Sequence, residues 1–117
     1  MIELPLMAYD ENLAERIREL IGSEPGLSER KMFGGLTFLI NGHMTIAASG
    51  QGGLLVRTDP VKTNELESMP EAEVMVMRGR PMPGWLRISS ENVSEDDDLK
   101  KWVEISSKYT SSLPPKS

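Results

Sequence analysis

The chain has 117 residues, 38% hydrophobic and 26% charged, which suits one domain with a packed core and excludes a disordered chain. A net charge of -5, from 13 Lys and Arg against 18 Asp and Glu, argues against direct nucleic-acid binding, because phosphate neutralisation needs clustered basic residues. The absence of cysteine excludes disulfides, thiolate metal sites and a cysteine nucleophile.

The N-terminal residues do not form a targeting signal. Residues 1–6 are apolar but short and lack a basic leader, and no segment reaches the roughly 18–20 apolar residues of a membrane span. Met7 is a candidate alternative start. We therefore expect a flexible lead at 1–7, one α+β domain at 8–113, a C-terminal tail at 114–117, a cytoplasmic location and no membrane partner.

A first helix is predicted from Glu11 to Gly22. Asp10 precedes it and can cap the free N–H groups of the first turn. The spacing i, i+4, i+7, i+8 gives one apolar stripe, formed by Leu13, Ile17, Leu20 and Ile21.

Strand periodicity begins at Leu36, where apolar residues recur at every second position. Asn41-Gly42 then predicts a type I′ hairpin turn, because both residues tolerate positive φ. The return strand covers Met44–Ala48, and a glycine-rich turn leads to a strand at Leu54–Thr58. Lys31–Phe33 is either a short strand of its own or part of the Leu36 strand, separated by a Gly34-Gly35 bulge.

The second half of the chain alternates between short elements. Asp59-Pro60 predicts a helix start that runs to about Ser68, and Val74–Met77 predicts a strand. The segment 79–84 is predicted to be a loop, because its two prolines disfavour a helix or a central strand. A strand at Trp85–Ile88 follows.

The last predicted helix starts at a Ser94 cap. Its buried stripe consists of Leu99, Trp102, Val103, Ser106, Tyr109 and Leu113. The predicted order is helix, three or four strands, helix, two strands, helix, with tight turns between strands. This order predicts an α+β fold with two layers, in which helices flank one antiparallel sheet.

Strand alternation divides the predicted sheet into two faces, provided that no bulge shifts the register. The core face contains Leu36, Phe38, Ile40, Met44, Ile46, Ala48, Leu54, Val56, Val74, Val76, Leu86 and Ile88. The opposite face is also rather apolar, and its candidate interaction residues are Leu39, Leu55, Met75, Met77 and Trp85, with Thr37, Thr45, Ala47, Arg57 and Arg87 among them. This face has three possible interpretations: a partly covered sheet face, a homodimer interface, or a recognition surface for a protein or small ligand.

Candidate chemistry is sparse. Arg57, Arg80 and Arg87 could converge on an anionic ligand beside the glycine loop at 50–53, or pair with nearby glutamates. The lone His43 has no partner histidine for a metal site. We predict no catalytic residue, metal or cofactor.

One motif points to a family. The run Arg30-Lys31-Met32-Phe33-Gly34-Gly35, followed by the hairpin, resembles the N-terminal domain of the TfoX/Sxy family of bacterial competence regulators. The resemblance continues through 54–57, 80–85 and the last helix, from about Ala8 to Leu113. It implies an antiparallel sheet flanked by helices, and no catalytic residues.

Better-known members of that family act in transcriptional activation of DNA-uptake genes through partner proteins, and usually carry a second, helical domain. We expect a stand-alone N-terminal domain here, acting as a non-enzymatic regulatory module that binds a protein partner or itself as a homodimer. The alternative is a small-molecule binder or enzyme that uses Arg57, Arg80 and Arg87.

Overall fold

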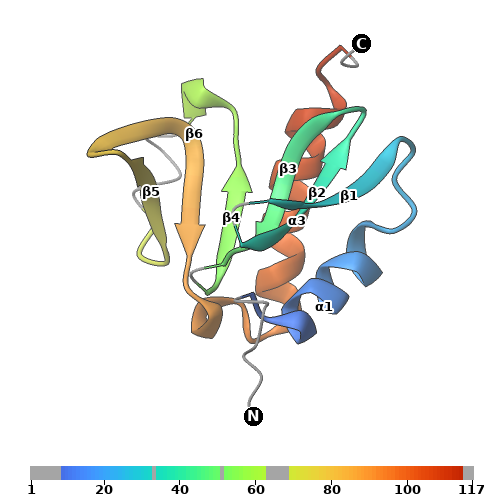
Figure 1. Ribbon diagram of the computed structural model, residues 1–117, viewed down its shortest axis with the longest axis horizontal. Coiled ribbons are helices and arrows are strands. Elements are labelled where there is room, and N and C mark those ends of the chain that lie inside the picture. The colour runs from blue at the N-terminus through green and yellow to red at the C-terminus, as the bar shows by residue number, and fades with distance from the viewer. Residues whose placement is uncertain (1–8, 33, 51, 63–68, 115–117) are drawn as a thin grey trace.

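A computed structural model describes residues 9–32, 34–50, 52–62 and 69–114. These contain two α-helices, α1 (Glu11–Ile21) and α3 (Asp96–Ser111), and two short 3-10 helices, η1 (Pro60–Lys62) and η2 (Ser90–Val93). The six strands are β1 (Leu27–Met32), β2 (Gly35–Ile40), β3 (His43–Ala48), β4 (Leu54–Arg57), β5 (Ala72–Met77) and β6 (Arg80–Ile88). The predicted lead at 1–7, most of the tail, and residues 63–68 of the predicted middle helix lie outside the described residues. The fold is α+β, as predicted (Figure 1).

The strands form one antiparallel sheet in the order β1-β2-β3-β4-β6-β5. Asn41 and Gly42 have φ of 53° and 86°, which confirms the predicted turn between β2 and β3. Lys31 and Met32 belong to a strand of their own, β1. The sheet is strongly twisted, so that β1 runs nearly crosswise to β4 and β6 (Figure 1).

Both helices pack against one face of the sheet, where the core lies. Asp10 caps α1 as predicted, because its carboxylate accepts hydrogen bonds from the amides of Asn12 (2.9 Å) and Leu13 (3.2 Å). The buried stripe of α1 differs from the prediction at two positions, because Ala14 is buried while Leu20 is 37% exposed. The fully buried side chains of the core include Ile17, Phe38, Ile40, Ile46, Leu54, Val56, Leu86, Leu99 and Trp102.

Ser94 does not cap α3, contrary to the prediction. It ends η2 instead, where its hydroxyl donates a hydrogen bond to the Glu91 carbonyl (3.2 Å), and Glu95 occupies the position before α3. The buried stripe of α3 also includes Thr110, whereas Tyr109 is only half-buried. The Thr110 hydroxyl shares a hydrogen bond of 2.8 Å with the Thr45 hydroxyl, which fixes the end of α3 to β3.

A bulge at Thr45 changes the face of one predicted core residue. Phe38 pairs with Ile46, but the next residue, Leu39, pairs with Met44, so Thr45 is an extra residue on β3. Met44 therefore lies on the same face as Leu39, and Thr45 lies on the helix side, where it is fully buried. The predicted faces of Met44 and Thr45 were wrong for this reason.

The predicted loop at 79–84 is largely part of strand β6, which includes Pro81 and Pro83. The last β4–β6 pair is Arg57 with Trp85, so both prolines lie where β6 has passed the end of β4. Pro81 pairs with Val76 on β5, whereas Pro83 lies in the irregular stretch between the Pro81 and Leu86 pairs. This end of the hairpin protrudes from the rest of the sheet (Figure 1). Val76, predicted to be in the core, is 61% exposed there.

Gly35 lies where two strands approach closely. A Cβ atom at this position would be 2.4 Å from the Ala48 carbonyl oxygen and 2.9 Å from the Gly50 nitrogen. Its neighbour Gly34 is different, because it has space around it but a φ of 77°, which favours glycine. The two glycines are thus required for different physical reasons.

An ion pair connects α1 to the edge strand β1. Arg18 donates to both carboxylate oxygens of Glu29, at 2.6 and 2.8 Å, and its guanidinium carbon lies 5.9 Å from the centroid of the Phe38 ring. The hydrogen bonds from Arg18 hold the pKa of Glu29 below its usual range. A carboxylate with a lowered pKa in the folded state stabilises the fold above its unfolded pKa, and this contribution is lost as the pH falls through the folded pKa.

We predict that Glu29→Gln lowers the free energy of unfolding by about 0.5 kcal/mol at pH 7, since a third of the side chain is exposed and solvent screens the pair. The difference from wild type should disappear as the pH is lowered below about 4. Urea denaturation at several pH values measures it. Glu19→Gln, at an exposed site on α1, is the matched control and should show no such difference. An effect of Glu29→Gln that is independent of pH would contradict this role.

We predict that Gly35→Ala lowers the free energy of unfolding by about 2 kcal/mol, because the added methyl group would overlap backbone atoms that cannot move alone. Gly34→Ala should cost only about 1 kcal/mol, the penalty for positive φ. Urea denaturation of both variants compares them directly. Equal costs would mean that the close approach at Gly35 is relieved by a small backbone shift.

Candidate functional site: the second face of the sheet

The second face is the side of the sheet opposite α1 and α3. Cross-strand partners share a face, so the register defines its rows of side chains. One row crosses all six strands and contains Arg30, Thr37, Ala47, Leu55, Arg87 and Glu73. Two shorter rows include the pairs Leu39–Met44 and Arg57–Trp85. Met75 lies where the β5–β6 register shifts, between Val74 and Val76, so no cross-strand pair places it in these rows.

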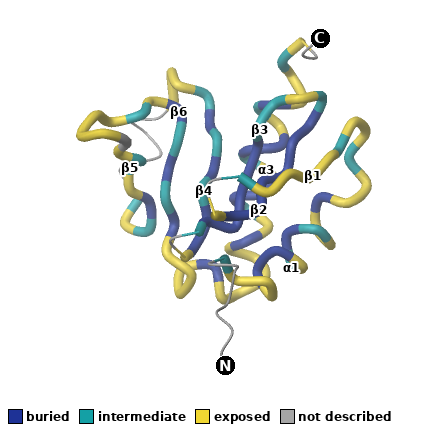
Figure 2. The backbone as a smooth tube through the Cα atoms, in the orientation of Figure 1, coloured by how far each residue is buried: buried dark blue, intermediate teal, exposed yellow. Residues whose placement is uncertain are grey.

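The centre of the second face is buried although neither described helix packs on it. Thr37, Leu39 and Ala47 are only 5–6% exposed. Figure 2 shows the change from buried backbone in β2 and β3 to more exposed positions in β5 and β6.

Around this centre lie half-buried apolar side chains, which are Met44, Leu55 and Trp85. Three of the five predicted interaction residues, Leu39, Leu55 and Trp85, are thus on this face by strand register, and Met75 has no cross-strand pair. Met77 pairs with Arg80 at the hairpin end, and its side chain lies outside the described part of the structure. Met44 also belongs to this surface, since it pairs with Leu39. It was predicted on the other face, because the bulge at Thr45 has no clear sequence signal.

Arg57 lies at the edge of this surface between two aromatic rings. Its guanidinium carbon is 5.9 Å from the centroid of the Trp85 ring on β6 and 5.8 Å from that of Tyr109 on α3. Its Nη1 donates a long hydrogen bond of 3.4 Å to the Met44 carbonyl. The guanidinium is therefore held by three elements that are far apart in the sequence.

The three predicted anion-binding arginines do not come together. Arg57 and Arg87 lie on neighbouring strands, two residues apart in register. Arg80 is exposed at the hairpin end, seven residues from Arg87 on β6, which corresponds to about 23 Å. Arg87 donates to the Ser49 hydroxyl (3.3 Å) and is the cross-strand partner of Glu73.

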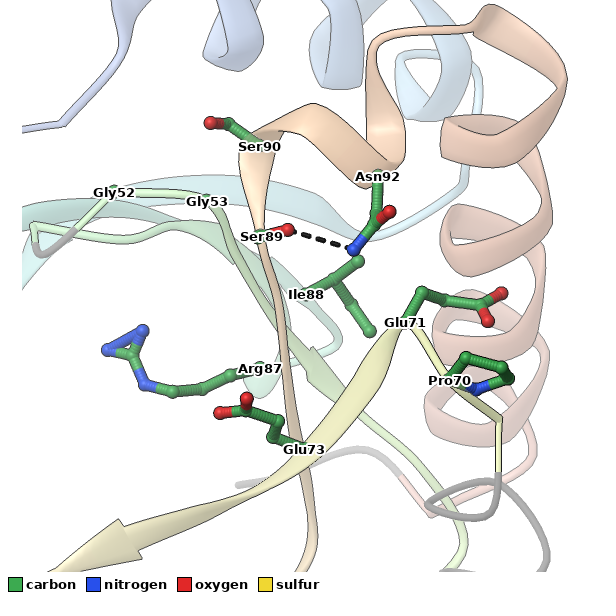
Figure 3. A pocket seen from close by; sticks show the side chains of 10 residues that line it. All are labelled: Gly52, Gly53, Pro70, Glu71, Glu73, Arg87, Ile88, Ser89, Ser90 and Asn92. Atoms are coloured by element: carbon green, nitrogen blue, oxygen red, sulfur yellow. Dashed lines mark hydrogen bonds between the residues drawn. The ribbon is translucent and has the colours of Figure 1, made fainter.

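A pocket of about 330 Å³ lies beside Arg87 at the end of β6 (Figure 3). It brings Arg87 next to the glycine turn, as the anion hypothesis requires, and its lining consists of Gly52, Gly53, Pro70, Glu71, Glu73, Arg87, Ile88, Ser89, Ser90 and Asn92. Glu73 extends alongside Arg87 (Figure 3). Lys101 donates to Glu71 (2.6 Å) and holds the pKa of that carboxyl below its usual range, so Glu71 is charged at neutral pH. Glu73 beside Arg87 disfavours an anion here, whereas Glu71 points away from Arg87 and pairs with Lys101 (Figure 3).

Other kinds of site find little support in the described residues. They contain no group of three or more His, Cys, Asp or Glu side chains placed to hold a metal ion. None of their helices has the length and apolar character needed to cross a membrane. His43 Nε2 lies 2.6 Å from the Pro114 carbonyl oxygen and so joins the β2–β3 hairpin to the end of the described chain.

The family motif lies at the start of the first hairpin. Arg30 and Lys31 are exposed on β1, and Met32 is half-buried where it pairs with Gly35. Phe33 lies outside the described residues, and Gly34 completes the turn. The motif thus forms an edge hairpin, and its two glycines have the structural roles described above.

Comparison with known proteins agrees with this arrangement. A search of curated proteins finds no match. The family model of the TfoX N-terminal domain matches residues 19–109, which run from the end of α1 to Tyr109 on α3 and include the whole sheet. Since the match covers more than half of the sequence, the chain belongs to the TfoX N-terminal domain family.

Proposed function

We propose that this protein is a non-enzymatic regulatory module of the cytoplasm, which acts in transcriptional control by binding a protein through the second face of its sheet. The bound protein is a partner or a second copy of the chain. Membership of the TfoX N-terminal domain family supports the regulatory class.

The observation that carries this proposal is the apolar second face. A two-layer domain normally has polar side chains on the face away from its helices. Here that face has a buried centre at Leu39 and Ala47, and half-buried Met44, Leu55 and Trp85 beside it. Partly accessible apolar side chains of this kind, with aromatic, methionine and arginine residues among them, are typical of protein interfaces.

The pocket beside Arg87 supports the alternative, a small-molecule site, less well. Glu71 and Glu73 both line it, and Arg80 lies at the distant hairpin end. A ligand of this pocket would need a negatively charged group for Arg87 and a positively charged group for the glutamates. Few small molecules meet that requirement, whereas a protein needs only apolar side chains to contact the second face.

We predict that Leu55→Glu abolishes binding by the second face, because it places a charge in the middle of the apolar surface. In the host cell this variant should reproduce the changes in transcript levels caused by deleting the gene. If the partner is a second copy, light scattering with size exclusion should also show loss of a species near twice the 13.0 kDa chain mass.

Leu20→Glu is the matched control, because Leu20 is an exposed leucine on α1, away from the second face. This variant should behave as wild type in both measurements, and circular dichroism should show both variants folded. If folded Leu55→Glu also behaves as wild type in both, the second face is not the binding surface.

A further inference from the structure

We infer that Arg57 is the charged anchor of the second face, and that it receives the carboxylate of an acidic side chain on a partner protein. Apolar side chains next to that acidic residue contact Leu55 and Trp85. This inference rests on the proposed function, because it specifies the chemistry of the partner for the same surface.

Within the described part of the chain, Arg57 differs from the half-buried Arg16, Arg18 and Lys101, each of which forms a salt bridge with a carboxylate. Arg16 pairs with Asp96 (3.0 Å), and Lys101 pairs with Glu71 (2.6 Å). Arg18 pairs with Glu29, and Arg87 has Glu73 as its cross-strand partner. Among the described residues no carboxylate forms a salt bridge with Arg57, in a chain with 18 acidic residues. Partly desolvated charges are normally paired, so Arg57 is suited to an external counter-ion.

The surroundings of Arg57 hold its guanidinium in place without using most of its donors. Trp85 and Tyr109 contact it through their ring faces, which accept no ordinary hydrogen bond. The Met44 carbonyl accepts one long hydrogen bond at 3.4 Å. A guanidinium has five N–H donors in a planar fork, so enough donors remain for a bidentate carboxylate. A side chain that is already fixed loses little conformational entropy on binding.

The neighbouring residues favour a protein side chain over other anions. Met44, Leu55 and Trp85 provide apolar contacts for residues that flank the carboxylate. Arg57 does not line the pocket beside Arg87, so the glutamates of that pocket are not part of its surroundings. An acidic residue between apolar residues matches both the charge of Arg57 and these apolar contacts.

The first test uses the wild-type chain and two blocked peptides, acetyl-Leu-Glu-Leu-amide and acetyl-Leu-Gln-Leu-amide. Two-dimensional ¹H–¹⁵N NMR titrations follow the Arg57 Nε–H, the Leu55 amide and the Trp85 indole N–H. We expect the Glu peptide to shift these signals in a saturable way and to bind about tenfold more tightly than the Gln peptide, since a charged hydrogen-bonded pair is lost in the latter. Equal affinity of the two peptides would overturn the inference.

Two variants then test whether Arg57 is the group that binds. Arg57→Gln should remove the difference between the Glu and Gln peptides, and Arg57→Lys should keep only part of it, because lysine retains the charge but not the planar fork. The exposed Arg80→Gln is the matched control and should retain the full difference. A preference for the Glu peptide that persists in folded Arg57→Gln would assign it to another residue and overturn the inference. If Arg57→Gln does not fold, the wild-type comparison still decides.

Phenylacetate and inorganic phosphate test the other anions. Weaker binding of both than of the Glu peptide is expected. If either binds as tightly as the peptide, the site is one for a free small anion, and the inference about a partner side chain fails.

The proposed function has a separate outcome. If Leu55→Glu alters transcripts but the Glu peptide shows no preference, the second face stands without this anchor. If the peptide preference holds but transcripts do not respond to Leu55→Glu, the proposed function fails and the anchor stands.

Discussion

The extra residue at Thr45 in β3 is the constraint on which both faces of this sheet depend. It places the Thr45 side chain on the helix side, where it shares a hydrogen bond with Thr110 and so positions the C-terminal part of α3. It also places Met44 on the second face next to Leu39. The carbonyl of the same Met44 accepts the hydrogen bond from Arg57. The bulge at Thr45 therefore determines both how α3 packs on the core and which β3 side chain lies on the second face.

The sheet is strongly twisted, and its second face is only partly exposed. Helices on one side alone would leave a flat sheet with a fully solvated opposite face. In this sheet β1 runs nearly crosswise to β4 and β6 (Figure 1), and Thr37, Leu39 and Ala47 on β2 and β3 are buried on the second face. The remaining exposed part is concentrated over β4 and β6, at Leu55 and Trp85. The surface area that a partner could contact is thus smaller than the area expected if every side chain on this face were exposed.

Features that depend on a few neighbouring residues could be predicted from the sequence. The Asp10 cap and the Asn41-Gly42 turn are of this kind, because their chemistry is local. The bulge at Thr45 and the strand through Pro81 and Pro83 were not predicted, because each depends on which strand lies alongside. Where no bulge shifts the register, strand alternation assigned most residues to the correct face of the sheet. The contact between Arg57 and Tyr109 joins residues far apart in the sequence, and no local pattern indicates it.

The same long-range dependence distinguishes the arginines that the sequence had grouped together. All three lie on β4 or β6, yet the environment of each is set by its neighbours across the sheet. Arg87 has Glu73 beside it on β5 and donates a hydrogen bond to the Ser49 hydroxyl. Arg80 lies in solvent at the hairpin end, where screening makes a single charge weak. Only Arg57 combines partial burial, two aromatic neighbours and the lack of a salt bridge among the described residues. A charge held in this way favours binding of an opposite charge from outside, because the cost of partly removing Arg57 from water has already been met by folding.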